Sequence, residues 1–282
     1  MDEGCLLKAA VQYTKESKAN YISKELAISP ELVGMRMYAE PIMGFASAED
    51  EYFTHLKEQG IIGDHYLHPQ EWLPRAKTVI SLFLPFSKEV KEGNKRDMVW
   101  PSPEWLHARI EGQVFINHLS MYLQGKLVNA GYKSVVPSLD ERFWTSINDS
   151  AKKGVFTSNW SERHAAFICG LGTFGLSKGL ITAQGVAGRF GSIITELYLT
   201  PSKREYEDLY QYCSYCGKCV KNCPVNAISL RSGKDHAICS EFLDKTAQKF
   251  TPRYGCGKCQ VNVPCESGIP SRKGSLPMGV YL

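Results

Sequence analysis

The sequence lacks any apolar run approaching the roughly 20 residues that a membrane helix needs, and it has little excess charge of either sign. Its 33 Lys and Arg stand against 29 Asp and Glu, a formal charge of +4 over 282 residues. That excess is too small to indicate a nucleic-acid partner by itself, and a phosphate-bearing small molecule would be served equally well. The first eight residues, MDEGCLLK, are acidic at the start and contain no apolar core. The sequence therefore predicts neither membrane contact nor a secretory signal peptide.

Cysteine is concentrated in one stretch, since eight of the ten cysteines fall between residues 213 and 265. Residues 213–224 read C-x2-C-x2-C-x3-C-P, the run of bacterial two-cluster ferredoxins, in which the fourth cysteine serves the other cluster. Three thiolates two residues apart can wrap three corners of one cube, whereas the fourth is held off by a turn and a proline. The predicted ligands of two 4Fe-4S clusters are Cys213, Cys216, Cys219 and Cys265 for the first, and Cys223, Cys239, Cys256 and Cys259 for the second.

Zinc and disulfides are the alternatives. Cys-x2-Cys pairs are also typical of zinc sites, and the end of the stretch, Cys256-x2-Cys259-x5-Cys265, departs from the second ferredoxin run. Four cysteines in eleven residues, however, over-supply one tetrahedral ion. Disulfides belong to secreted proteins, and oxygen-sensitive clusters with unbridged thiols point to a reducing cytoplasm. Of the cysteines outside the stretch, we expect Cys5 to be a buried small hydrophobe.

Apolar periodicity predicts an alternation of helices and strands before this stretch. The expected elements are an amphipathic helix over 2–27, a strand over 31–38, a helix over 49–59, a buried strand over 78–84, a long helix over 104–130 and a strand over 132–136. This order favours an α/β layer architecture. Polar residues 202–208 read as a linker, so we predict two domains, 1–201 and 202–282. A further helix over about 237–249 would present Cys239 from its first turn.

A glycine-rich segment precedes the linker. Asn159 and Glu162 resemble a capping box, which predicts a helix from Trp160 that closes at Gly170. The glycines of Gly170-Leu-Gly-Thr-Phe-Gly175 can turn the chain or approach a ligand closely. They follow a helix rather than a strand, so they are not a dinucleotide fingerprint.

Taken together, residues 170–175, residues 191–199 and the ferredoxin run resemble epoxyqueuosine reductases and their reductive-dehalogenase relatives; residues 52–60 and 73–80 agree. The resemblance implies a nitroreductase-like α/β (α+β) domain that binds cobalamin, followed by a ferredoxin-like domain that passes electrons to it. Cofactor contacts carried over by the resemblance are Gly170, Leu171, Gly172, Thr173, Phe174, Gly175, Lys178, Arg189, Gly191 and Ser192.

The chain departs from this family at its catalytic positions. The family's aspartate follows the strand that corresponds to residues 132–136, where Asp140 takes its place. The family's lysine aligns with Leu176, and Lys178 lies two residues later. The predicted catalytic residues are Asp140, His164 and Arg163, with Tyr198 as a further proton donor. His164 also fits a structural role, and Arg163 also fits a cofactor phosphate or a surface ion pair.

The family implies a low-potential electron donor, a ferredoxin or flavodoxin, and either a small-molecule substrate or tRNA. Seventeen residues follow Cys265, so we do not expect the helical extension with which longer epoxyqueuosine reductases contact tRNA. Two further classes stay open: an electron-transfer or reductive-activation protein for a corrinoid protein partner, and a flavin reductase holding FMN.

Overall fold

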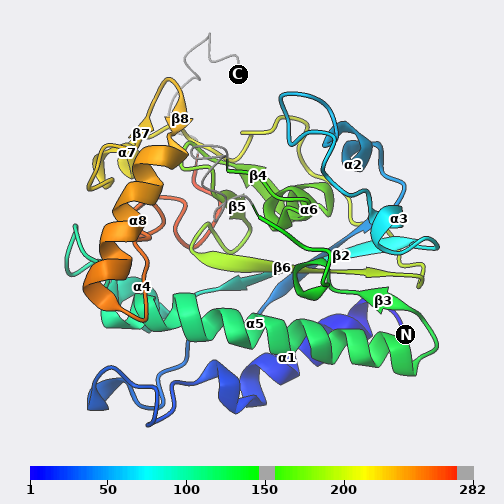
Figure 1. Ribbon diagram of the computed structural model, residues 1–282, viewed down its shortest axis with the longest axis horizontal. Coiled ribbons are helices and arrows are strands. Elements are labelled where there is room, and N and C mark those ends of the chain that lie inside the picture. The colour runs from blue at the N-terminus through cyan, green and yellow to red at the C-terminus, as the bar shows by residue number, and fades with distance from the viewer. Residues whose placement is uncertain (146–155, 272–282) are drawn as a thin grey trace.

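The computed structural model describes residues 1–145 and 156–271, and a four-stranded antiparallel sheet lies at its centre (Figure 1). The strand order is β1 (Ile42–Ser47), β2 (Thr78–Pro85), β6 (Gly188–Thr195) and β3 (Ser134–Val135). β2 pairs along its whole length with β6, from Thr78↔Thr195 to Pro85↔Gly188. Every residue of β2 is buried, which confirms the predicted central strand.

Helices cover both faces of the sheet (Figure 1). Alternation along β2 sends Ile80, Leu82 and Leu84 to the core shared with α1 (Glu3–Glu16) and α5 (Pro103–Asn129). Val79 and Phe83 point to the other core, with α2 (Glu51–His55), α3 (Pro69–Trp72) and α6 (Glu162–Ile168). Side chains on successive strand residues point to opposite faces, so a strand that is apolar throughout requires both layers.

The cysteine-rich part lies beside the end of α5 against which α4 (Lys88–Gly93) packs (Figure 1). It contains α7 (Lys218–Lys221), the strand pair β7 (Ile228–Ser229) and β8 (Gly233–Lys234), and α8 (His236–Phe250). The hairpin of β4 (Gly172–Phe174) and β5 (Leu180–Thr182) precedes β6. Arg253 forms a bidentate ion pair with Glu111 of α5, donating to Oε1 at 2.6 Å and to Oε2 at 3.2 Å. The division at residue 201 stays a prediction.

The long helix α5 and the helix that carries Cys239 are confirmed, whereas three predictions near the N-terminus are wrong. The first helix ends at Glu16, and a short 3-10 helix, Lys18–Asn20, follows. The buried amide of Asn20 donates to the carbonyls of Thr14 and Tyr38, a tertiary contact that holds the chain in this turn. Residues 31–38 form isolated bridges and a 3-10 turn instead of a strand. Cys5 is exposed rather than buried.

No helix in the described ranges is long and apolar enough to cross a membrane.

Candidate functional site

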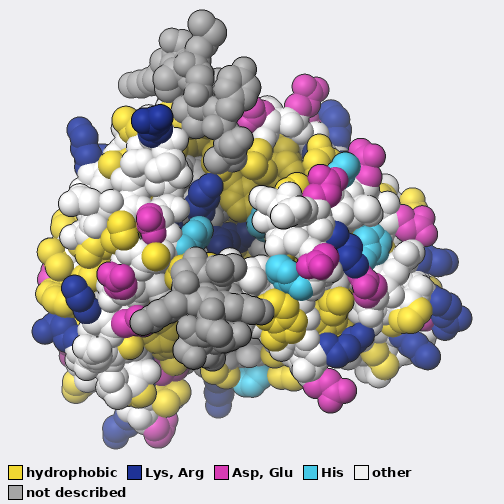
Figure 2. Space-filling model, turned by 45° about the horizontal axis from the view of Figure 1, so that its top comes forward, with side chains coloured by type: hydrophobic (Ala, Val, Ile, Leu, Met, Phe, Trp, Pro, Cys, Tyr) yellow, Lys and Arg dark blue, Asp and Glu magenta, His cyan; other side chains and the backbone are white. Residues whose placement is uncertain are grey.

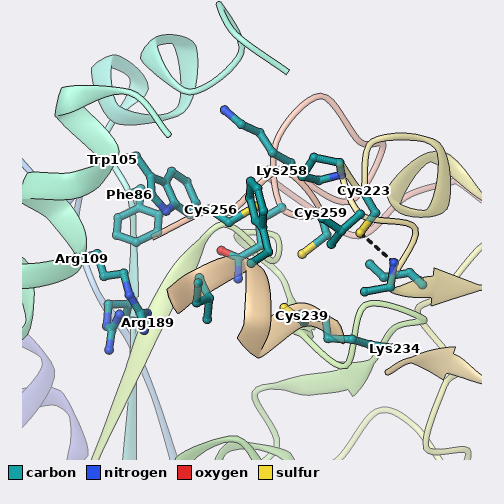
Figure 3. A pocket seen from close by; sticks show the side chains of 18 of the residues that line it. Phe86, Trp105, Arg109, Arg189, Cys223, Lys234, Cys239, Cys256, Lys258 and Cys259 are labelled. Atoms are coloured by element: carbon teal, nitrogen blue, oxygen red, sulfur yellow. Dashed lines mark hydrogen bonds between the residues drawn. The ribbon is translucent and has the colours of Figure 1, made fainter. Parts of the chain in front are cut away.

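Two cavities lie in the cysteine-rich part, and each is lined by one of the two predicted cysteine sets. The larger, of about 160 Å³, has Cys223, Cys239, Cys256 and Cys259 in its wall (Figure 3). The smaller is lined by Cys213, Cys216, Cys219 and Cys265. Each group thus unites cysteines that are more than thirty residues apart in the chain.

Elements of the α/β layers form one wall of the larger cavity. Phe86 and Trp105 pack edge to face, with ring centroids 4.7 Å apart, beside Arg109 and Arg189 (Figure 3). On the cysteine side, the backbone N–H of Ala227 donates to Cys223 Sγ at 3.2 Å. Hydrogen bonds to the sulfur ligands are one of the means by which proteins set a cluster's potential.

The β4–β5 hairpin and the segment after it contact the chain on both sides of the smaller cavity. Tyr212 directly precedes Cys213, and its backbone N–H donates to Thr173 Oγ1 at 2.8 Å. The N–H of Val186 donates to the Cys265 carbonyl at 2.8 Å. Gly185, at φ +86°, packs directly on the backbone of Glu266. These contacts bring the last cysteine of the chain to the first three.

Two copies of the tetrapeptide Cys-Gly-Lys-Cys contribute one to each cavity. Both glycines are left-handed, Gly217 at φ +67° and Gly257 at φ +70°. Lys218 is exposed, but Lys258 is fully buried, and its ammonium donates to Asn94 O and Oδ1 at 2.8 and 2.9 Å. Desolvation lowers the pKa of Lys258 to about 8.

The cysteines of both sets are available as metal ligands. Among the described residues, no three His, Cys, Asp or Glu side chains converge closely enough for one metal ion, so the choice between a cluster and a zinc ion rests on the cysteine run of residues 213–224. All ten cysteines are unbridged. Burial raises the pKa of Cys219, Cys256 and Cys265 to about 12, so binding of iron must displace protons from these thiols.

Most of the predicted cofactor-contact residues are packed inside protein. Gly172 leaves only 1.9 Å between an added Cβ and the Ile181 carbonyl oxygen, so its glycine is required by the hairpin. Leu171, Thr173 and Phe174 are buried, and Gly170 faces Ser202 and Lys203. On β6, Gly191 packs on Ile116 and Ser120 of α5, and on the opposite face of the sheet Ser192 accepts a hydrogen bond from Trp160 Nε1 at 2.9 Å.

Three predicted residues do reach the cavities or their surroundings. Gly175 borders the smaller cavity, and a Cβ added at this residue would lie 3.8 Å from Cys213 Sγ. Arg189 lines the larger cavity, and its guanidinium donates to Gln113 Oε1 at 2.6 Å. Lys178 donates to the Tyr210 hydroxyl at 3.2 Å.

A group of cationic side chains lies between α6, the β4–β5 turn and the start of α8. Arg163 donates to the Lys178 carbonyl. Burial first, and then Lys234, Arg163 and Lys178, lower the pKa of His236 to about 4. Solvent reaches Arg163, yet the protein around it desolvates the guanidinium enough to lower its pKa. Figure 2 shows the surface hollowed, with Lys or Arg and His side chains inside the hollow.

The predicted catalytic residues have different surroundings. His164 shares a 2.7 Å hydrogen bond with Ser161 and packs on Phe174, and burial lowers its pKa to about 4, so it is neutral at pH 7. Asp140 is paired with Arg142 at 2.7 Å, which lowers the pKa of the carboxyl. Arg142 in turn donates to the carbonyls of Glu71 and Trp72. The structure therefore places Asp140 in an ion pair that fixes a loop, and Tyr198 on the surface, 65% exposed.

The predicted capping box is wrong. The helix begins at Glu162 after Ser161, because Asn159 uses its side chain elsewhere, accepting from Trp144 N at 3.0 Å and donating to Arg142 O at 2.8 Å.

Sequence reasoning missed a buried polar group beside α6. Both carboxylate oxygens of Glu162 and the hydroxyl of Tyr66 are buried without a hydrogen-bond partner among the described residues. Desolvation raises the pKa of Glu162 to about 7. No signal in the sequence indicates this, because an acidic residue at the first position of a helix is ordinary. Cys169, next to this group, donates weakly to Val79 O at 3.4 Å and is buried, in keeping with a packing role.

Comparisons with known proteins find one family and several solved structures that resemble this chain. The family described as a 4Fe-4S binding domain matches residues 209–229. A solved catabolic reductive dehalogenase gives a TM-score of 0.53 at 16% identity, covering 82% of this chain and 30% of that chain. No curated protein matches the sequence significantly.

Two other solved structures are less similar in fold. An epoxyqueuosine reductase with a bound tRNA stem loop gives 0.49 at 17% identity, over 93% of this chain and 66% of that one. A reductive dehalogenase described as supporting B12-dependent dehalogenation gives 0.48 at 17% identity, over 72% and 27%. This chain spans 61 to 65% of the length of three other epoxyqueuosine reductases, two of them from Streptococcus thermophilus and Bacillus subtilis.

The class of protein is therefore a mixed α/β fold with a ferredoxin-like 4Fe-4S segment near the C-terminus. Its α/β part has the fold of the matched portion of a reductive dehalogenase, which confirms the predicted resemblance at the level of the fold.

Proposed function

We propose that the protein is an iron–sulfur oxidoreductase that binds two 4Fe-4S clusters, each held by the four cysteines of one cavity. The observation that carries this proposal is the division of eight cysteines into two groups of four around two separate cavities. The ferredoxin run crosses between them, since Cys213, Cys216 and Cys219 line one cavity and Cys223 the other, as ferredoxin ligation requires.

The second part of the proposal is a corrinoid beside the cationic side chains Arg163, Lys178 and Lys234, in a nitroreductase-like domain. The chemistry of the side chains fits: Arg163, Lys178 and Lys234 are donors, and a corrinoid offers amide oxygens and a phosphate as acceptors. His164 is neutral at pH 7, so one of its ring nitrogens can donate a hydrogen bond and the other can accept one. When bound, the clusters and the corrinoid supply one-electron transfer and a reducing metal centre.

The residues of this chain then have separate tasks. The cysteines hold the clusters, and Trp105 with Phe86 closes the larger cavity from the side of α5. Arg163 and Lys178 would orient an anionic or amide-bearing group of the corrinoid. Asp140 can serve as an acid only after leaving Arg142, so we assign it no proton delivery while that ion pair is intact.

Reductive activation of a corrinoid protein partner is the second candidate. It is favoured by the pairing of Asp140 and by the low pKa of His164, which leave no evident acid among the predicted catalytic residues. The clusters would then deliver electrons to a corrinoid on the partner.

Anaerobic purification followed by iron, sulfide and cobalt analysis tests these proposals, with and without added cobalamin. About eight irons per chain with retained corrinoid supports the first function. Eight irons without corrinoid affinity supports the second. About four irons, or zinc in place of iron, contradicts the assignment of the two cavities.

A further inference from the structure

The net charge of the chain resides in one short segment that contains the first ferredoxin cysteines. Residues 209–234 have four Lys or Arg and no Asp or Glu, whereas the rest of the chain has 29 of each kind. These 26 residues, which Asp208 and Asp235 flank, therefore have a formal charge of +4, equal to that of the whole chain. A formal charge of +4 is small for 282 residues, but it is a high density of positive charge for a segment of 26.

Three of these four cations lie on the surface around one cysteine. Lys218 and Lys221 of α7 and Arg231 of the β7–β8 turn are exposed, and they make no ion pair within the described ranges. Cys216 is the exposed member of the eight cysteines in the stretch. The fourth cation, Lys234, lines the larger cavity instead (Figure 3).

An apolar side chain stands within this basic group. Leu230 is 55% exposed, and its Cδ2 lies 3.4 Å from where a Cβ on Gly217 would be, so it adjoins Cys216. α7 packs against β7, which carries the turn with Leu230 and Arg231 beside the cysteine loop. We call Cys216, Lys218, Lys221, Leu230 and Arg231 the α7 face.

We propose that the α7 face is the docking surface for a small acidic protein that carries one electron at low potential. This inference rests on the proposed iron–sulfur function, because the electron would enter at the cluster held by Cys216. Transient redox complexes bury small areas, and their association is accelerated by opposite charges around the contact. A basic rim with an apolar centre beside the most exposed ligand has these features. One electron leaves the reduced carrier and reduces the cluster, and no bond forms or breaks.

Charge reversal tests the proposal in the anaerobic, cluster-loaded protein. The variant K218E/K221E/R231E is compared with K8E/K15E/K18E, which has the same change in charge on exposed residues of α1 and of the 3-10 helix after it. Stopped-flow spectroscopy follows cluster reduction by a reduced acidic ferredoxin, and biolayer interferometry measures its binding. At low ionic strength we expect the second-order rate to fall at least tenfold in the first variant and to change little beyond the general charge effect in the second. The difference should shrink as salt is raised.

The outcomes separate the two proposals. Dithionite should reduce all three proteins at equal rates, which shows that the clusters are intact. Equal slowing in both charge variants, or an unchanged rate in the first, overturns the α7 face as a docking surface while the iron–sulfur assignment stands. An α7-face variant that loses binding to a tRNA stem loop and keeps electron delivery overturns it in favour of RNA. Absence of iron from the wild-type protein overturns both proposals.

Discussion

Gly257 gives the sharpest test of how the second cysteine set is held. An alanine Cβ at this position would lie 1.9 Å from Trp105 Cζ2, and Trp105 is a buried side chain packed on Phe86. The residue is also left-handed, at φ +70°. Gly257→Ala therefore combines a backbone penalty with a steric clash that moves either the indole or the Cys256–Cys259 loop.

Gly217 is its natural control. It lies in the same tetrapeptide at φ +67°, but an added Cβ meets nothing closer than Leu230 Cδ2 at 3.4 Å. Gly217→Ala should cost only the left-handed penalty, about 1–2 kcal/mol. Gly257→Ala should cost a further 1–3 kcal/mol or so for overpacking. At about 2–4 °C per kcal/mol for a protein of this size, the extra fall in melting temperature is roughly 2–12 °C.

The assay is thermal unfolding of the anaerobic protein together with iron per chain. We expect Gly217→Ala to retain both clusters and Gly257→Ala to lose iron toward four atoms per chain. Trp105→Leu should relieve the clash, so that adding Gly257→Ala in that background costs no more than Gly217→Ala does alone. Equal effects of the two glycine substitutions in the wild-type background would refute the role of Trp105.

Other substitutions test individual residues of the site. Cys239→Ser should reduce iron from about eight to about four atoms per chain, whereas Cys5→Ser should leave it unchanged, because Cys5 is exposed on α1. The pKa of His164 in the folded protein is about 4, below its ordinary 6.5, so the folded protein binds fewer protons than the unfolded chain and loses stability as pH falls from 6.5 to 4. His164→Gln should reduce this acid-side loss of unfolding free energy by at most about 3 kcal/mol, as measured by urea unfolding at several pH values. Glu162 has the opposite sign, since its pKa rises from 4.5 to about 7 and stability falls as pH rises through that window; Glu162→Gln should remove this loss, and an unchanged profile would contradict the burial of its carboxylate. Asp140→Asn should cost about 1 kcal/mol or less, because Arg142 is 42% exposed, and should leave reductase activity in place; a complete loss of activity in a folded variant would restore Asp140 as the acid.

The core elements could be predicted because their signals are local and strong. β2 is a continuous apolar strand, so its residue pattern itself indicates burial on both faces, and α5 has apolar residues at helical spacing over its length. The pattern did not show which apolar residues of α5 are buried, since Leu119, Leu123 and Leu127 are, whereas Val114 is 49% exposed. The predictions near residues 20 and 159 were wrong for one reason. Asn20 and Asn159 look like ordinary turn or cap residues, yet their amides bond to backbone far away in the sequence, at Tyr38 and Arg142.

The candidate site divides in the same way. Spacing predicted that Cys213, Cys216 and Cys219 share one site and that Cys223 serves another, because the length of chain between thiolates limits which corners of a cube they can reach. It did not place Cys239, which no neighbouring cysteine supports in the sequence and which the structure brings to the cavity of Cys223. The roles of Gly170–Gly175 did not follow, since glycine is needed equally for a ligand and for close packing. Gly172 proves to serve the packing of the β4–β5 hairpin.

The two copies of Cys-Gly-Lys-Cys show where sequence ends and tertiary structure begins. The tetrapeptide by itself determined the separation of the two thiols and the need for glycine at a left-handed position, because both depend on a few neighbouring torsions. It could not determine that Lys218 is exposed on the α7 face while Lys258 is buried against Asn94. Asn94 and Trp105 come from segments some 150 residues earlier in the chain, and only packing of the cysteine-rich part against α4 and α5 brings them to the second tetrapeptide.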